Sequence, residues 1–260
     1  MTTGVLELKG ISKTFGGVAS VVDCNFVIRR GSITGLVGPN GAGKTTCFNM
    51  IAGIIRPDTG YILFDLEDIT GLSDHKIFHK GVARTFQIPH EFSQLTVLDN
   101  LLVGAGPLNG ENWVHALFQP AKTRIDEEKL TKRAKEVLEL IKLEHMSDRP
   151  AVELSGGQKK LLELGRSIMS GPKLLLLDEP GAGVNPTLLE GIIERIRDIH
   201  GQGVTFLIIE HNMELVMRLC SSVLVMVEGG ILMQGSPEDI RSDPRLIDAF
   251  LGGGTLCSDN

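Results

Sequence analysis

Residues 38–46 read GPNGAGKTT and fit the phosphate-binding pattern G-x-x-x-x-G-K-[ST]. The glycines allow consecutive backbone N–H groups to point at one anion. An apolar run precedes the segment and a helical pattern follows it, which an ordinary glycine turn would not require. We expect Lys44 to reach the β- and γ-phosphates of a nucleotide and the Thr45 hydroxyl to bind Mg²⁺. The expected lining residues are Gly38, Pro39, Asn40, Gly41, Ala42, Gly43, Lys44, Thr45 and Thr46.

Polar side chains also follow three apolar runs, where buried strands would end. Asp178 and Glu179 follow four leucines, Glu210 and His211 follow a run rich in isoleucine, and Gln87 ends a short strand-like run. Ligands of an open parallel sheet bind at the carboxyl ends of its strands, and adjacent carboxylates are costly to bury without a cation or donors. The alternatives are solvated acids at a strand end and a structural histidine.

Each of these strand ends can supply a different group for phosphate chemistry. We expect Asp178 to hold Mg²⁺, directly or through water, and Glu179 to orient the attacking water. His211 is the expected contact to the γ-phosphate. The carbonyl oxygen of Gln87 can bind Mg²⁺ and hold the water.

The segment LSGGQ, residues 154–158, is a second candidate anion site. Ser155 is predicted to cap a helix, and Gln158 three residues later completes a capping box. Gly156 and Gly157 weaken the first turn by up to about 1 kcal/mol each relative to Ala. In return they expose N–H groups and permit close backbone approach at a positive helix end. No apolar run leads into this segment, so the site has no strand of its own.

The hydrophobic pattern predicts an α/β chain around these segments. Strands are expected over residues 5–8, 21–28, 33–37, 61–64, 82–87, 174–177 and 204–209, with a hairpin over 223–227 and 231–234. Helices are expected over 44–55, 188–199, 213–219 and part of 237–251. Residues 12–17 are expected to form a loop that carries Phe15. The four leucines at 174–177 indicate a strand covered on both faces.

Residues 88–168 differ in character and are expected to form a mainly helical insertion. A helix is predicted to start within 95–102, and residues 104–120, which hold the only Trp, are expected to form a loop. One helical face carries Leu130, Ala134, Val137, Leu138 and Ile141. The expected organisation is one domain over 5–251, with an α/β core at 5–87 and 169–240, a helical subdomain at 88–168 and a tail at 241–260.

Composition narrows the classes of function. The 260 residues are 42% hydrophobic, enough for a sizeable core, and the net charge of −6 argues against charge-driven nucleic-acid binding. The four cysteines, at positions 24, 47, 220 and 257, lack metal-ligand spacing and indicate reduced thiols in a cytosolic setting. We expect no signal peptide and no membrane span, so any action at a membrane would need a partner.

Taken in this order, GPNGAGKTT, RTFQ, LSGGQ, LLLLDEP and IIEHN resemble the nucleotide-binding domain of ABC transporters, over residues 5 to 251. The resemblance implies a P-loop NTPase fold of the ABC ATPase type. Such a fold has a RecA-like parallel-sheet core, an N-terminal antiparallel β subdomain and an inserted helical subdomain. It also implies ATP hydrolysis with Mg²⁺ in a head-to-tail dimer that holds two ATP at its interface.

In that dimer, Ser155, Gly156, Gly157 and Gln158 of one chain would face the phosphate loop of a second ABC ATPase subunit, identical or related. Phe15 stands where the family places an aromatic that stacks on adenine, although simple packing would also explain a lone loop Phe. The segment around Gln87 and the helical insert would face transmembrane permease subunits. This arrangement places the chain on the inner face of the cell membrane.

One position departs from the common family pattern, because Asn185 stands where an Asp is usual. The departure weakens any charged interface role there. The same variant resembles the group that serves branched-chain amino-acid importers, as do FGG at 15–17, GVARTFQ at 81–87, IEHNM at 209–213 and SDPRLIDAFLG at 242–252. The resemblance thus implies an importer ATPase for branched-chain or other hydrophobic amino acids, served indirectly by a substrate-binding protein.

Other functions share much of this pattern. Export of lipid or lipopolysaccharide and transport of urea are alternatives within the transporters. Soluble cassette ATPases of DNA repair or translation would have long coiled coils or two cassettes, which this chain lacks, whereas iron–sulfur assembly ATPases are single cassettes too. A nucleotide-binding module without hydrolysis is a third class, and the presence of both Glu179 and His211 argues against it.

Overall fold

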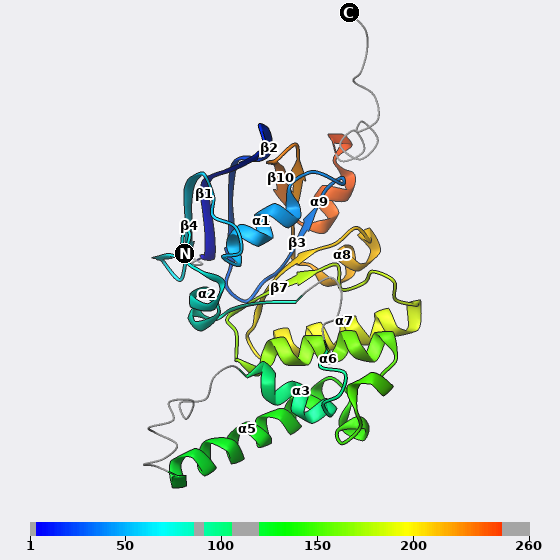
Figure 1. Cartoon of the computed structure of the whole chain (residues 1–260). Coiled ribbons are helices and arrows are strands. Elements are labelled where there is room, and N and C mark those ends of the chain that lie inside the picture. The colour runs from blue at the N-terminus through cyan, green and yellow to red at the C-terminus, as the bar shows by residue number, and fades with distance from the viewer. Residues whose placement is uncertain (1–3, 86–90, 106–119, 246–260) are drawn as a thin grey trace, which may run out of the picture.

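The computed structural model describes residues 4–85, 91–105 and 120–245, with a central sheet covered on both faces (Figure 1). Within these residues six strands form the central sheet, in the order β10–β9–β3–β8–β7–β6. The strands are β3 (Ile33–Val37), β6 (Val82–Arg84), β7 (Leu174–Asp178), β8 (Thr205–Ile209), β9 (Ser222–Val227) and β10 (Gly230–Gly235). All neighbours are parallel except β10, which is antiparallel to β9. The carboxyl ends of β3, β8 and β7 therefore meet at one edge.

Alternate residues of the central strands face two separate cores. Leu175 and Leu177 of β7 pack in one core, and Leu174 and Leu176 pack in the other. All four leucines are buried, so the prediction of a strand covered on both faces is confirmed. The phosphate-loop helix α1 (Lys44–Ile51) belongs to the core on one face, and α6 (Gly156–Met169) belongs to the core on the opposite face.

A second, antiparallel sheet packs with α1 and has the strand order β2–β1–β4–β5. Its strands are β1 (Gly4–Phe15), β2 (Val18–Arg29), β4 (Thr59–Phe64) and β5 (Glu67–Asp68). The expected loop at 12–17 is wrong, because β1 continues to Phe15, which pairs with Val18. Only Gly16 and Gly17 turn the chain, with φ of 52° and 86°, as a tight hairpin between twisted strands requires.

Three further helices, α3 (Val97–Gly104), α5 (Pro120–Leu140) and α7 (Pro186–Gly201), lie beside α6 in the lower part of Figure 1. Helices α8 (Met213–Leu219) and α9 (Pro237–Ser242) lie higher in that view, beside the central sheet. Short 3₁₀ turns lie at Glu144–Met146 and Ala151–Glu153. The predicted apolar face of α5 is buried at Ala134, Val137 and Leu138 and continues at Ile141 just past its end. Among the described residues, none of the helices combines the length and apolar character that a membrane crossing needs.

Several element boundaries differ from those expected. Helix α1 ends at Ile51 rather than near 55, because Gly53 turns the chain at φ 76°. Strand β6 ends at Arg84 rather than at residue 87, and of the expected strand residues 86 and 87 lie outside the described residues. Helix α2 (Asp74–Lys80) was not predicted; it follows Ser73 and ends at Gly81, whose φ of 101° stops it.

The cysteines that the structure describes are free and buried. Cys24 and Cys47 lie in the core around α1, and Cys220 follows α8. Burial raises the pKa of the Cys220 thiol to about 12, which keeps it protonated and unreactive. The fourth cysteine, at position 257, lies outside the described residues.

Candidate functional site

The phosphate loop joins β3 to α1 and is closely packed against its surroundings. A Cβ atom at Gly38 would lie 2.0 Å from the carbonyl oxygen of Met226, and one at Gly43 would lie 2.3 Å from that of Ser20. Both glycines have positive φ, 152° and 96°. No side chain caps the start of α1, so its first N–H groups are left for a ligand in the loop.

Lys44 points back across the loop from the first turn of α1. Its Nζ atom donates to the carbonyl oxygens of Gly38 and Pro39, both at 2.8 Å, and the residue is only 6% exposed. Burial lowers the pKa of Lys44, while the nearby carboxylates of Glu179 and Asp178 act in the opposite direction. The loop therefore combines a held ammonium group with backbone donors, as binding of a polyphosphate requires.

The two threonines after Lys44 have different surroundings. Thr45 is exposed on the first turn of α1, where its hydroxyl can meet a hydrated cation. The Thr46 hydroxyl lies 2.8 Å from the hydroxyl of Ser20 in β2. This contact joins the loop to the antiparallel sheet, close to the hairpin that carries Phe15.

Phe15 ends β1 with 45% of its surface exposed. The Lys13 ammonium lies 5.5 Å from its ring centroid, and Asp58 holds that ammonium at 2.6 Å. A ring with this much exposed surface can stack on a flat ligand.

Asp178 ends β7 and is 7% exposed. Its Oδ2 atom accepts a hydrogen bond from the Arg84 guanidinium at 2.8 Å, and Arg84 also donates to Asn49 of α1. Arg84 thus connects β6, β7 and α1. The sequence does not predict this role, because nothing in the strand pattern around Arg84 indicates its partner.

Glu179 and His211 come together from neighbouring strand ends. The His211 Nε2 atom lies 2.7 Å from Glu179 Oε1, and the two side chains are 41% and 19% exposed. Glu179 has a φ of 50°, an uncommon conformation for a residue with a side chain, which at a functional site is a sign of a required geometry. Its own N–H donates to the Ile209 carbonyl at 3.0 Å. The structure therefore joins two of the predicted site residues.

Glu210 is the second feature that the sequence analysis missed. It is 3% exposed, and its carboxylate accepts N–H groups from Gly181 at 2.7 Å, His211 at 2.9 Å and Asn212 at 3.1 Å. The sequence indicated only an acid at a strand end. A buried carboxylate is retained where backbone donors satisfy it.

The segment 154–158 forms the predicted capping box. The Ser155 N–H donates to Gln158 Oε1 at 2.9 Å, and the Gln158 N–H donates to Ser155 Oγ at 3.4 Å. A Cβ atom at Gly157 would lie 1.6 Å from a methyl carbon of Leu188, whereas one at Gly156 would meet nothing within 4 Å. Helices α6 and α1 lie on opposite faces of the sheet. The capping box and the phosphate loop of one chain therefore form two separate candidate anion sites.

The remaining predicted contact, Gln87, lies outside the described residues. The described chain stops at Thr85, whose N–H donates to the Leu176 carbonyl oxygen at 2.9 Å. In the described part of the chain, no three His, Cys, Asp or Glu side chains form a ready metal cage. Mg²⁺ does not require one, because it usually takes one or two protein ligands with phosphates and water. Exposed Thr45 and the carboxylate of Asp178 fit that use.

Comparison with known proteins agrees with this arrangement. The sequence model of the ABC transporter family matches residues 21–182. The probable branched-chain amino acid transport ATP-binding protein LivG of Archaeoglobus fulgidus is 40% identical over 250 residues, 95% of each chain. The high-affinity branched-chain amino acid transport ATP-binding protein BraF of Pseudomonas aeruginosa is 39% identical over 255 residues, 97% of this chain and 99% of that one.

Solved structures agree as well. A cassette of an ABC transporter in its ADP conformation has a TM-score of 0.84 at 35% identity, covering 96% of this chain and 100% of that one. A nucleotide-free cassette has a TM-score of 0.82 at 35% identity, covering 95% and 98%. The expected ABC ATPase fold is confirmed. The chain belongs to the ABC transporter family and is one of its ATP-binding cassettes, with ATPase activity.

Proposed function

We propose that this cassette is the ATPase subunit of an importer for branched-chain or other hydrophobic amino acids. The observation that carries the proposal is similarity along 95% or more of the chain to relatives named for branched-chain amino acid transport, in an archaeon and in bacteria. ATP binding and hydrolysis would drive partner permeases. A substrate-binding protein would deliver the amino acid to the permeases and take no part at this chain.

Within the ATP site, different residues bind the phosphates, the adenine, Mg²⁺ and the attacking water. Lys44 and the N–H groups of the loop hold the β- and γ-phosphates, and Phe15 stacks on the adenine. Thr45, Asp178 and Gln87 hold Mg²⁺, which when bound neutralises charge on the phosphate oxygens. Glu179 accepts a proton from the attacking water, and His211 positions Glu179 and donates to the γ-phosphate. Lys44 and Thr45 belong to α1, Phe15 ends β1, and the ends of β7 and β8 supply the acidic and histidine side chains, so the site requires the whole fold.

A second cassette, identical or related, completes the site. Ser155 and Gly156 are exposed, and the space beside Gly156 is open. The capping box and the phosphate loop lie on opposite faces of the sheet. A head-to-tail dimer lets the box of each chain donate to the γ-phosphate held by the other. Closure of the dimer then depends on ATP, and hydrolysis reopens it.

The domain layout follows the same proposal. An α/β core over 5–87 and 169–240 binds nucleotide, and the helical subdomain over 88–168 meets the permeases. Together with the tail at 241–260, this gives one cassette that sits peripherally on the inner face of the membrane. The net charge of −6 suits neither an anionic lipid surface nor nucleic acid, so permease contacts provide the attachment.

The variant Glu179→Gln tests the hydrolytic assignment. We expect it to bind ATP and to accumulate as an ATP-bound dimer, with turnover reduced about 100-fold or more because a general base is lost. Steady-state phosphate release and size-exclusion chromatography with ATP are the measurements. Glu153→Gln, at an exposed glutamate, is the matched control and should retain turnover. Normal hydrolysis by the Glu179 variant would refute the role of Glu179.

Co-purification and uptake test the transport assignment. We expect the native protein to purify with a membrane permease pair, and the reconstituted complex to take up leucine, isoleucine or valine in an ATP-dependent way. Uptake of urea, or movement of lipid or lipopolysaccharide, would instead assign another transporter class. A protein that associates with no permease would contradict the importer proposal.

A further inference from the structure

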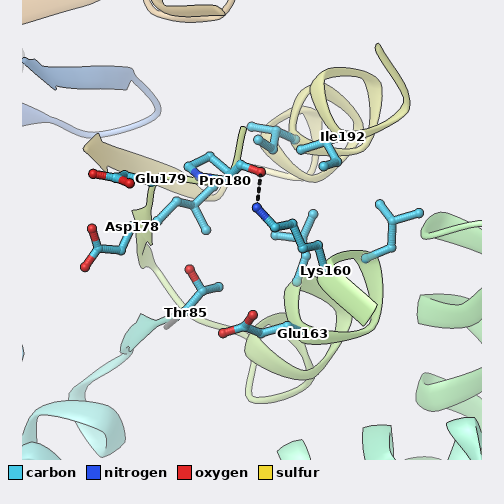
Figure 2. A pocket seen from close by; sticks show the side chains of 11 residues that line it. Thr85, Lys160, Glu163, Asp178, Glu179, Pro180 and Ile192 are labelled. Atoms are coloured by element: carbon cyan, nitrogen blue, oxygen red, sulfur yellow. Dashed lines mark hydrogen bonds between the residues drawn. The ribbon is translucent and has the colours of Figure 1, made fainter. Parts of the chain in front are cut away.

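The turn at residues 180–182, directly after Glu179, is held from two sides. On one side, the Gly181 N–H donates to Glu210 Oε1 at 2.7 Å. On the other side, the Lys160 ammonium donates to the carbonyl oxygen of Pro180 at 3.3 Å and to that of Ala182. Figure 2 shows Lys160 reaching Pro180 from the helix, while the carboxylates of Asp178 and Glu179 point away from it. Side chains thus hold the Gly181 N–H and the carbonyl oxygens of Pro180 and Ala182. The Ala182 N–H donates to the Glu179 carbonyl oxygen at 3.1 Å, which closes the turn.

The Glu210 carboxylate also fixes the neighbouring strand end. Its Oε2 atom accepts the N–H groups of His211 and Asn212, at 2.9 and 3.1 Å. One buried carboxylate thus holds the turn after Glu179 and the backbone of His211 at the same time. A Cβ atom at Gly181 would approach Glu210 Oε1 to 2.8 Å, so the fit leaves no room for a larger residue.

Lys160 connects this turn to the helix of the capping box. It lies on α6, two residues after Gln158, and it is half-buried. Burial lowers the pKa of Lys160, while the carboxylates of Glu210, Glu163 and Glu179 act in the opposite direction. The Lys160 ammonium therefore joins α6 to two carbonyl oxygens of the turn.

We infer that Lys160 and Glu210 are positioning residues that clamp the turn at 180–182 and hold Glu179 against His211. Lys160 lies on α6, which also carries the capping box. The clamp therefore links Glu179 and His211, which act at one ATP site, to the capping box that the same chain presents to the other ATP site. The inference rests on the proposed function, since it requires ATP sites shared between two cassettes. A shift of α6 when the capping box meets the partner's nucleotide would then move Glu179 relative to His211.

A double-mutant cycle on the full-length protein tests the clamp, with Glu210→Gln, Lys160→Met and the double variant. Each single change should lower kcat for ATP about 10- to 100-fold, because small misplacement of a catalytic group has effects of this size. The KM for ATP should change less than about twofold, since neither residue touches the nucleotide. The double variant should be no slower than the slower single variant, because both changes release the same turn.

Two further variants separate positioning from folding. Lys160→Arg keeps the donors and should recover most of the lost kcat, whereas Lys135→Met, at an exposed lysine of α5, should leave kcat unchanged. Thermal unfolding identifies any variant that lowers kcat by unfolding. If Glu210→Gln does not fold, Gly181→Ala tests the same contact, because its methyl group displaces Oε1 without removing a charge; it should give the same selective loss of kcat.

The outcomes distinguish the two proposals. If the wild-type protein hydrolyses ATP and Glu179→Gln does not, but the clamp variants keep wild-type kcat or lose it multiplicatively, the clamp is overturned and the proposed function stands. A wild-type protein that purifies as a folded dimer and hydrolyses no ATP would overturn the proposed function and the clamp together.

Discussion

Gly156 and Gly157 are adjacent and yet serve different purposes. The space beside Gly157 is filled by Leu188 of α7, so the absence of a side chain there permits close helix packing. The space beside Gly156 is open, so the absence of a side chain leaves the backbone accessible to a partner. A pair of glycines that the sequence presents as one feature thus divides into a packing position and an open position, which the proposed dimer would use for binding.

Alanine substitutions at the two positions should have different effects on stability and on ATPase activity. Gly157→Ala should destabilise the protein by about 1–3 kcal/mol, because the new methyl group must displace Leu188. Gly156→Ala should leave the stability unchanged or raise it by up to about 1 kcal/mol, because Ala favours a helix. It should still lower ATPase activity, because its methyl group meets the partner's nucleotide. Thermal unfolding and phosphate release are the measurements, and equal unfolding temperatures for the two variants would contradict this division.

Asn185, which stands where the family usually has Asp, is the N-cap of helix α7. It caps α7, with Oδ1 accepting the Leu188 N–H at 2.9 Å, and Pro186 follows at the first position of the helix. Asn and Asp cap helices about equally well. The local requirement at this position is therefore an acceptor, and a charge is not needed for the fold.

Substitutions of Asn185 should follow the rules for helix caps. Asn185→Ala should cost about 1 kcal/mol, while Asn185→Asp should retain the cap and gain a few tenths of a kcal/mol from the helix dipole. Urea unfolding of the two variants checks both values. If Asn185→Asp were as destabilised as Asn185→Ala, a role beyond the cap would be required for the amide. ATP turnover of the folded Asp variant then measures any effect at the dimer interface.

Elements with a strong local pattern could be predicted from the sequence, and features that depend on partners far along the chain could not. The buried run at 174–177, the helix at 213–219 and the capping box at 155–158 each carry their own signal. The strand through Phe15 depends on pairing with β2, because Ser12, Lys13 and Thr14 before it are polar and lack a strand pattern. Of the three donors to Glu210, His211 and Asn212 follow it directly in the chain, but the Gly181 N–H reaches it only because the fold brings two strand ends together.

At the scale of the whole molecule, a single carboxylate links the antiparallel sheet to the central sheet. Asp65 follows β4, and its N–H donates to the Val5 carbonyl at 2.9 Å. Its carboxylate accepts hydrogen bonds from Arg30, which lies between β2 and β3, and from Lys173 before β7, the latter at 2.6 Å. The two sheets are thus joined through charge as well as through the core around α1.

This link should make stability depend on pH in a defined direction. Burial alone would raise the pKa of Asp65, but the hydrogen bonds from Lys173 and Arg30 outweigh it and lower the pKa below its ordinary 3.8. A carboxyl whose pKa is lower in the folded state stabilises the protein above its unfolded pKa and loses that effect as pH falls through the folded pKa.

Asp65→Asn should therefore be less stable than wild type at pH 7 by about 1 kcal/mol, or roughly 2–4 °C in Tm. The value is modest because Arg30 and Lys173 are both about half exposed and water screens the pairs. The difference should stay constant from pH 7 to about 5 and shrink below pH 4, as the wild-type carboxyl takes up its proton. Urea unfolding across this range measures it, with Glu153→Gln as the control at an exposed pair. A difference that stays undiminished as the pH falls from 5 to 3, or that grows, would show that shape and not charge joins the sheets at Asp65.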